Sequence, residues 1–353
     1  MPFAFARRAC TVSRRPGIRG VLLLAVALAL ALGSFAPVWA SSESMASATT
    51  TPVAASAAAT AAPVPSAAAT ETSAPAADAR SELSYLDAVV LGVVEGVTEF
   101  LPVSSTGHLL VAGRLLGLDG TDAFDSYAIA IQAGAIIAVL ALYWPRARSV
   151  LRGVFAHDQD GRRLAVNLVV AFVPAAVIGL VLEGPIKDRL FSPWAIAAAW
   201  VVGGVVILLF EQRRRAAQFH GRRLEELTVR MALIVGCAQV FGLWPGASRS
   251  LVTILAGMLL GLQVGAAVEL SFLLGLLTVG AATSYETLKN GSTMLDAYGL
   301  GRPLVGLVAA LVSAVVAVRW MVSWLQSRGL AIFGWYRIGV AALLVVLLVT
   351  GAV

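Results

Sequence analysis

The segment EGVTEFLPVSSTGHLLV, from Glu95 to Val111, places two carboxylates, several hydroxyls and an imidazole inside an otherwise apolar stretch. Glu95 and Glu99 are four residues apart, so on a helix their side chains project from the same face. Two like charges at this spacing repel, and both stay ionised only beside a cation such as a metal ion or a guanidinium. The alternative, a charged helix end that faces water, is disfavoured by the apolar flanking residues.

The motif PVSSTGH adds Ser104, Ser105, Thr106 and His108 to the acidic pair. A hydroxyl beside an imidazole is the minimum for an activated nucleophile, and an imidazole alone can also attack phosphorus. Ser105 and His108 are therefore both candidate nucleophiles. Serine and threonine also cap helices, so Ser104 and Thr106 have a structural interpretation of equal weight beside phosphate binding.

A second polar motif, WPGASRSLVT, supplies Ser248, Arg249, Ser250 and Thr253 between two apolar runs. Backbone amides at a helix start bind anions, and a guanidinium binds phosphate through two parallel hydrogen bonds. The alternative is an arginine that extends to the membrane surface. The motif predicts a site for phosphate with Arg249 at its centre.

Together the two motifs predict one membrane pocket for a lipid that carries phosphate or pyrophosphate. Hydrolysis there would need in-line attack on a phosphorus whose charge is neutralised by a cation and by Arg249. Two more polar residues in apolar segments, Gln239 and Glu269, are candidates for the site or for cross-links between helices.

Composition predicts the class of protein that must position these groups. Of 353 residues, 59% are hydrophobic and 13% are charged, whereas soluble domains carry roughly a quarter charged residues. Several apolar runs approach the ~20 residues that cross a bilayer as a helix. We therefore expect an all-α polytopic membrane protein whose spans cover approximately residues 127–144, 164–182, 194–210, 267–286, 303–323 and 334–352.

The two motifs interrupt residues 84–118 and 231–262, which are apolar at both ends. Proline and glycine in the middle of such segments predict two short half-helices that meet at a break. The alternative is a pair of complete crossings in each region. Each half of the domain (about 81–210 and 231–353) then has one re-entrant hairpin and three transmembrane helices. An odd number of spans inverts the second half relative to the first, which predicts an inverted-topology repeat.

The first 80 residues differ from the rest. Residues 1–40 have the basic, apolar and small-residue order of a secretory leader, with an uncleaved first helix as the alternative. Residues 41–80 are mostly Ala, Ser, Thr and Pro, which predicts a flexible tether before the membrane domain at 81–353. Because the net charge of +6 includes five leader arginines, it gives no reason to expect nucleic acid as a partner.

Loop charge predicts the orientation. The loops at 145–163 and 211–230 are rich in arginine and are expected to face the cytoplasm. The loops at 119–126, 183–193 and 287–302 are acidic or mixed. With six spans, both ends of the membrane domain are then expected outside.

Both motifs resemble the signature regions of the bacterial undecaprenyl-diphosphatase family of the bacitracin-resistance type. The likeness continues through FVPAAVIGLVLE, ELSFLLG and FGWYRIGVAALLVV and covers residues 84–352. It implies a multi-pass enzyme of the bacterial cytoplasmic membrane, with its site toward the outer side. This enzyme removes the terminal phosphate of undecaprenyl pyrophosphate, recycles the carrier for peptidoglycan synthesis and confers bacitracin resistance.

The resemblance also assigns residues and cofactors. It implies that Glu95 and Glu99 bind a divalent cation, Mg²⁺ or Ca²⁺, and act in catalysis. Ser105 and His108 match the family's nucleophile candidates, Arg249 its phosphate-binding arginine, and Ser248 and Thr253 supporting positions. The bilayer is an expected partner, and a homodimer is a candidate assembly.

Departures from the family pattern lie in the second half, at Leu251, Gln263, Val264 and Leu270 and at a proline missing from LLGLLTVG. They put the geometry around Arg249 in question. The rival function is a lipid-phosphate transporter or flippase, since inverted repeats with broken helices also build transporters. Clustering of Ser105 with His108 favours an enzyme over a transporter, because transport of a lipid needs no nucleophile. A phosphatidic-acid-type phosphatase would need a histidine after the second motif, and none follows His220.

Overall fold

The computed structural model describes residues 82–351, except for residues 119, 157 and 217–220. The predictions for the leader at 1–40 and the tether at 41–80 lie outside these residues. In the described part, the regular elements are helices, and six of them are long and apolar enough to cross a membrane. The prediction of an all-α polytopic membrane protein with six spans is thus confirmed. These spans are Asp122–Leu142, Gln159–Val181, Pro193–Arg214, Val264–Tyr298, Gly301–Arg328 and Ala331–Val349.

The first hairpin consists of α2 (Tyr85–Thr98) and α3 (Ser105–Leu116), which pack against each other. The hydroxyl of Ser84 accepts a hydrogen bond from the Asp87 amide and caps α2. The chain then turns through Pro102, whose ring cannot continue a helix. Gly117, at φ 70°, ends α3 in the left-handed conformation that glycine adopts readily.

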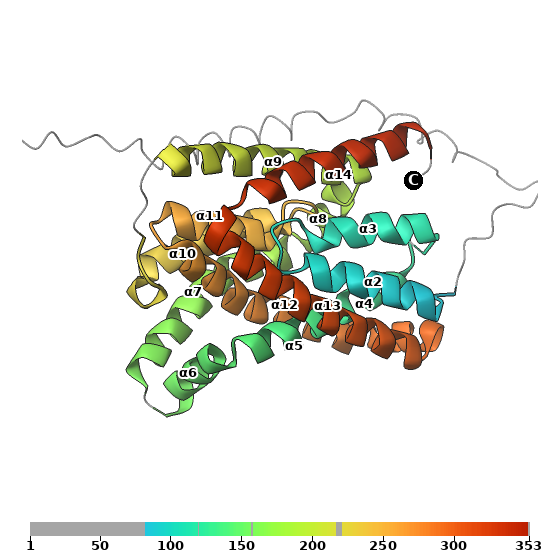
Figure 1. The fold of residues 1–353 in the computed structure, drawn as a ribbon. Helices are drawn as coiled ribbons and strands as arrows, with labels where there is room; N and C mark the ends of the chain where they lie inside the picture. The colour runs from blue at the N-terminus through green and yellow to red at the C-terminus, as the bar shows by residue number, and fades with distance from the viewer. Residues whose placement is uncertain (1–81, 119, 157, 217–220, 352–353) are drawn as a thin grey trace, which may run out of the picture. The chain divides into compact units, whose positions relative to one another are not determined.

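The second hairpin consists of α10 (Val229–Gln239), the short 3₁₀ helix η2 (Val240–Leu243) and α11 (Arg249–Leu259). Thr228 caps α10 as Ser84 caps α2. In Figure 1, α2 and α3 lie toward one end of the helical bundle, and α10 and α11 lie toward the other. The broken segments were thus placed correctly as short helices around a break.

A serine with positive φ stands at each break. Ser104 has φ 76° and Ser248 has φ 72°, and each directly precedes a helix. A side chain in this conformation is strained by about 1–2 kcal/mol. Contacts between the breaks hold the conformation: the Gly246 amide donates to Ser104 Oγ at 3.1 Å, and Ser250 Oγ donates to the Leu101 carbonyl at 2.8 Å.

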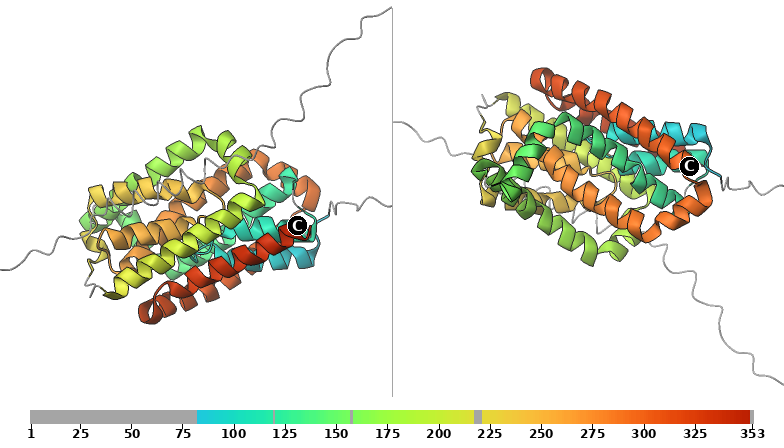
Figure 2. Two further views of the ribbon diagram at one scale, coloured as in Figure 1. Left: turned by 90° about the horizontal axis from the view of Figure 1, so that it is seen from above. Right: turned by 90° about the horizontal axis from the view of Figure 1, so that it is seen from below.

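The remaining helices pack around the two hairpins. α2 lies along α13 (Gly301–Arg328), α10 along α7 (Gln159–Val181), and α9 (Pro193–Ala216) along α14 (Ala331–Val349). The pairing of α9 with α14 is visible in Figure 1 and again from above in Figure 2.

Several element ends differ from the expected ones. The basic segment at 145–163 is mostly helical, as α6 (Trp144–Phe155), and the loop at 183–193 contains α8 (Glu183–Leu190). The span expected at 127–144 begins earlier, as α4 (Asp122–Ala130) followed by α5 (Gln132–Leu142). α12 (Val264–Tyr298) continues through most of the loop expected at 287–302. Hydropathy predicts which residues lie within the membrane, but it does not predict where a helix ends. A helix continues beyond an apolar run until a residue that terminates helices is reached.

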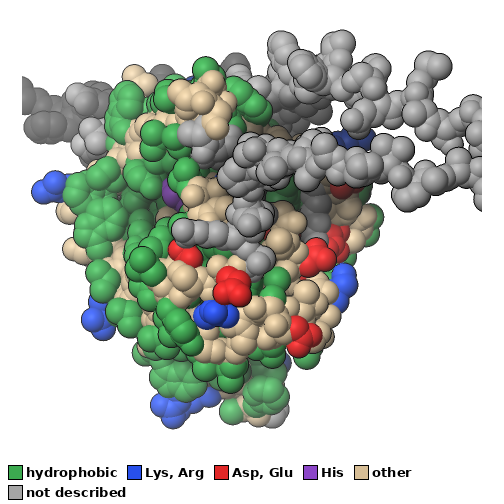
Figure 3. Space-filling view, turned by 90° about the vertical axis from the view of Figure 1, so that its right-hand side faces the viewer, with side chains coloured by type: hydrophobic (Ala, Val, Ile, Leu, Met, Phe, Trp, Pro, Cys, Tyr) green, Lys and Arg blue, Asp and Glu red, His purple; other side chains and the backbone are tan. Residues whose placement is uncertain are grey.

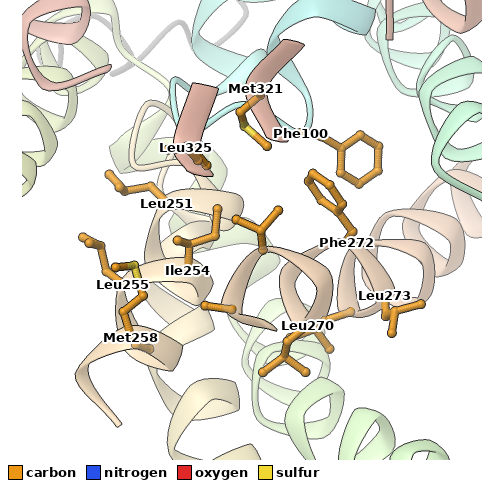
Figure 4. Close-up of a cluster of buried hydrophobic side chains, with 14 of the residues drawn as sticks. Phe100, Leu251, Ile254, Leu255, Met258, Leu270, Phe272, Leu273, Met321 and Leu325 are labelled. Carbon is orange, nitrogen blue, oxygen red and sulfur yellow. The ribbon is translucent and has the colours of Figure 1, made fainter. Parts of the chain in front are cut away.

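The largest apolar core joins the two hairpins to α12 and α13. Figure 4 shows Phe100 of the first break beside Phe272 of α12, with Leu251 and Ile254 of α11 nearby. The Phe100 and Phe272 rings meet edge to face, with their centroids 5.3 Å apart. This core places the first break and α11 against the same helix, α12.

Candidate active site

A chain of polar contacts joins the two breaks through Glu99. Ser105 Oγ, in the first turn of α3, donates a hydrogen bond to Glu99 Oε2. On the other carboxylate oxygen, Arg249 Nη2 donates to Glu99 Oε1 at 3.2 Å. The side chains of Glu99 and Arg249 are only 8% and 13% exposed, so little water screens this ion pair. The structure therefore brings together three of the predicted residues from the two motifs.

The guanidinium of Arg249 is held on several sides. Nη1 donates to the Ser271 carbonyl of α12 at 3.0 Å, and the Phe100 ring centroid lies 5.5 Å from Cζ. A Cβ atom at Gly275 would lie 2.6 Å from Nη1, so only glycine leaves room for the guanidinium against α12. Gly275 is the last residue of ELSFLLG, and nothing in its own segment indicates this role.

Glu95 lies one turn before Glu99 and is fully buried, with 0% of its surface exposed. Neither of its carboxylate oxygens has a hydrogen-bond partner within the described part of the chain. A buried polar atom without a partner is costly, and in native proteins it indicates a ligand, an ion or a water molecule. Carboxylate oxygens are the ligands that Mg²⁺ and Ca²⁺ prefer, so Glu95 and Glu99 together fit a divalent cation.

His108 lies one turn after Ser105 on α3 and is fixed through both ring nitrogens. Nδ1 is 2.6 Å from the Ser104 carbonyl, and Nε2 is 2.9 Å from the Tyr336 hydroxyl. A carbonyl can only accept, so Nδ1 carries the proton and a neutral ring accepts from Tyr336 at Nε2. The ring also packs near those of Trp200 and Tyr336, with centroids 4.8 Å and 5.8 Å away. These contacts do not connect the imidazole to Ser105 or Glu99.

The other predicted phosphate-binding residues mainly support the breaks. Ser104 accepts from Gly246, as described above, and makes no capping hydrogen bond to α3. Ser248 Oγ lies 3.0 Å from Ser250 Oγ and caps α11 by accepting from the Leu251 amide. Thr253 Oγ1 donates to the backbone of its own helix and lies 2.7 Å from Ser271 Oγ. Thr106 is half-buried in the first turn of α3.

The two additional polar candidates, Gln239 and Glu269, have different surroundings. Glu269 accepts from Arg146 Nε at 2.6 Å, and the same guanidinium donates to Glu225 at 2.7 Å. The cross-linking interpretation thus holds for Glu269, which joins α12 to α6. The pKa of Glu225 lies below its usual range, because hydrogen bonds from the backbone amide of Glu225 and from the Arg146 guanidinium favour the charged carboxylate. Gln239 is buried, and neither polar atom of its side chain has a partner among the described residues.

Besides Gly275, two more residues of the site were missed from the sequence, Tyr336 and Arg337, both within FGWYRIGVAALLVV. Tyr336 contacts His108, which is 228 residues away. Arg337 contacts the backbone of both breaks. A charge with apolar residues on both sides identified Arg249, and the same signal could have identified Arg337.

In the described part of the chain, six helices apolar enough to cross a membrane surround two broken hairpins that are joined by a buried ion pair, which defines a polytopic membrane protein. The chain belongs to the bacitracin resistance protein BacA family, whose sequence profile matches residues 88–343.

Relatives that cover most of this chain are named undecaprenyl-diphosphatases. An undecaprenyl-diphosphatase of Sorangium cellulosum is 46% identical over 261 residues, covering 73% of this chain and 85% of that protein. One of Herminiimonas arsenicoxydans is 44% identical over 259 residues, covering 72% of this chain and 91% of that protein. Undecaprenyl-diphosphatase 1 of Burkholderia lata is 46% identical over 254 residues, with 71% and 91% covered.

Substituting Gly275 by alanine tests the placement of Arg249. The new methyl group would displace the guanidinium, and we expect kcat to fall about tenfold, because small misplacements at a reacting centre have large effects. Thermal stability should not fall in parallel, since alanine favours the interior of a helix. Gly280→Ala on the same helix meets no atom within 4 Å and is the matched control. Equal phosphate release by both variants would contradict this role of Gly275.

Proposed function

We propose that the protein hydrolyses undecaprenyl diphosphate to undecaprenyl phosphate and inorganic phosphate. This reaction regenerates the lipid carrier for peptidoglycan synthesis and gives resistance to bacitracin. The observation that carries the proposal is the contact chain Ser105–Glu99–Arg249, which combines a hydroxyl, a base and a phosphate-binding cation. Family membership and the names of the relatives support it.

Ser105 is the nucleophile that the contacts favour. Its Oγ–H already donates to Glu99, so the carboxylate can take the proton as Oγ attacks the terminal phosphorus. The bond from this phosphorus to the bridging oxygen breaks, and undecaprenyl phosphate leaves with the bonding electron pair. Glu99 then releases the proton to water. In the second step, water attacks the phosphoserine, Ser105 recovers a proton, and inorganic phosphate leaves.

Arg249 and the start of α3 stabilise the charge of the transferred phosphoryl group. Arginine has five N–H donors, and the contacts to Ser271 and Glu99 use two of them. The others can meet phosphate oxygens. The first turn of α3 has no side-chain cap, so its backbone amides are available to an anion as well.

His108 is the second candidate nucleophile. Its Nε2 atom faces the Tyr336 hydroxyl, so attack by the imidazole requires that this hydrogen bond opens. Trapping a phosphorylated protein from Ser105→Ala would identify His108 as the nucleophile. Trapping it only from protein that retains Ser105 supports the serine.

Glu95 and Glu99 would hold the divalent cation, Mg²⁺ or Ca²⁺. No third His, Cys, Asp or Glu joins them in the described part of the chain, which leaves diphosphate oxygens and water as further ligands. A cation bound there neutralises negative charge on the diphosphate. Its presence also reduces the repulsion between the two carboxylates.

Chelation tests the cation. We expect EDTA to reduce phosphate release to the background rate and Mg²⁺ or Ca²⁺ to restore it, because the cation would neutralise negative charge on the diphosphate. The control is Glu95→Gln, which should retain little activity and should gain little from added cation. Full activity of the wild-type protein in EDTA would rule out a metal role for the two carboxylates.

An inverted repeat is the second part of the proposal. It is supported by helix contacts, since α2 of the first half lies on α13 and α10 of the second half lies on α7. Local structure recurs in the same way. The same number of residues separates the members of each equivalent pair: the caps Ser84 and Thr228, the close-packed Gly92 and Gly236, the break residues Ser104 and Ser248, and the helix-ending Gly117 and Gly261.

We place the site toward the outer side of the cytoplasmic membrane, with the arginine-rich segments in the cytoplasm. In support, α6 and α10 lie toward the same end in Figure 1. On the face at the opposite end, acidic side chains extend from the middle to the right, with some Lys or Arg side chains beside them, as Figure 3 shows. A homodimer remains a prediction, to be tested by the mass of the detergent-solubilised protein.

A hydrolase is distinguished from a transporter or flippase by one assay. Purified protein in detergent, with no membrane gradient, should release one phosphate per undecaprenyl diphosphate and leave the lipid monophosphate. Shorter and water-soluble diphosphates measure how much the lipid contributes. Absence of phosphate release from any of them would favour the transporter.

A further inference from the structure

Arg337 is a fully buried arginine on α14, with 0% of its surface exposed. Its guanidinium donates to the carbonyl of Pro102 in the first break at 3.2 Å. It also donates to Gly246 at 2.6 Å and Ala247 at 3.3 Å in the second break. A fourth acceptor is the Ala199 carbonyl of α9 at 3.0 Å. One planar side chain thus connects both breaks and two transmembrane helices.

Burying a guanidinium costs several kcal/mol unless its donors are satisfied. Within the described residues, the hydrogen-bond acceptors of Arg337 are all backbone carbonyls. The fold also makes room for it, because a Cβ atom at Gly203 of α9 would lie 2.7 Å from Cζ. A neutral side chain could fill this space without the cost of desolvation, but it would leave these carbonyls without their donor.

The carbonyls that Arg337 holds flank the reacting groups. Pro102 lies between Glu99 and Ser105, and Gly246 and Ala247 directly precede Ser248 and Arg249. Ser104 and Ser248, the two strained serines, adjoin these same carbonyl-bearing segments. Moving either break relative to the other would therefore change the distance from Ser105 to Arg249.

We propose that Arg337 is a positioning residue for catalysis, which fixes the two breaks so that Ser105 and Arg249 meet the same phosphoryl group. It acts through the backbone and touches neither Ser105 nor Glu99. This inference rests on the proposed phosphatase function.

The test compares Arg337→Met, Arg337→Lys and wild type for turnover of undecaprenyl diphosphate in detergent. Arg337→Met should lower kcat about tenfold to a hundredfold, the size expected for a shift of about 1 Å at the reacting atoms. KM should change by less than about twofold, since Arg249 and the cation-binding carboxylates remain. Lysine keeps the charge and three donors but not the planar fork, so it should recover part of kcat.

Two adjacent glycines provide a second measurement in case Arg337→Met fails to fold. Gly203→Ala would press on the Arg337 guanidinium, whereas Gly204→Ala would press on the Gly334 carbonyl and Ile338 of α14. In both variants the new methyl group crowds the contact between α9 and α14. We expect thermal stability to fall in both variants, and kcat per folded molecule to fall at least several-fold more in Gly203→Ala.

Unchanged kcat in Arg337→Met, or a loss that only matches the loss of folded protein, would overturn the inference. Equal kcat in the two glycine variants would do the same. Both outcomes leave the proposed function intact as long as the wild-type protein releases phosphate. If the wild-type protein releases none, the proposed function itself fails.

Discussion

Glu99→Gln is expected to lower kcat about a hundredfold to ten-thousandfold, the contribution of a general base. The amide has nearly the shape of the carboxylate but cannot take the Ser105 proton, and it carries no charge to face Arg249. Loss of the base lowers kcat, and loss of one of the two carboxylates that would hold the cation should raise KM as well. Phosphate release in detergent with undecaprenyl diphosphate measures it.

The control for Glu99→Gln is Glu82→Gln, which removes an exposed carboxylate just before the same helix. That variant should match the wild type in kcat and in thermal stability. A wild-type rate for Glu99→Gln, with folding confirmed by the melting temperature, would remove Glu99 from the mechanism.

Arg249→Ala is expected to reduce kcat/KM about a thousandfold to a hundred-thousandfold, the range for an arginine that stabilises phosphoryl transfer. The substitution removes the phosphate-binding guanidinium and leaves Glu99 without its ion-pair partner at 8% exposure. KM should rise with this variant too, because arginine binds the diphosphate before the reaction as well.

Arg249→Lys separates charge from geometry. Lysine keeps a cation near Glu99 but loses the fork that reaches both Ser271 and the carboxylate, so it should fall between alanine and wild type. Arg319→Ala, at an exposed position on α13, is the control. Equal activity of Arg249→Ala and Arg319→Ala would show that the guanidinium plays no part.

Much of the fold could be predicted from the sequence because the bilayer imposes its own length on apolar helices. The breaks were also predictable, since Pro102 in the first motif and Pro245 with Gly246 in the second disfavour a helix in the middle of an apolar stretch. Polar helices were not predictable in this way. α6 and the end of α12 lie where hydropathy falls, and α12 continues there until Gly299, at φ 66°, ends it.

The candidate site was predictable where a charged residue stands within an apolar segment, as Glu95, Glu99 and Arg249 do. Gly275 and Tyr336 gave no such signal, because their roles depend on partners in other helices. The hydroxyls of Ser104 and Ser250 suggested phosphate binding, whereas their contacts join the two breaks. Sequence shows which groups are present, but only the fold shows which of them are already bound.

The most direct test is an experimental structure of the protein with a non-hydrolysable undecaprenyl diphosphate analogue, in which a methylene group replaces the bridging oxygen. We predict that the terminal phosphonate contacts Arg249 of the second break and lies within reach of Ser105 Oγ of the first. A head group bound to one break alone, with the other break turned away from it, would contradict the shared site.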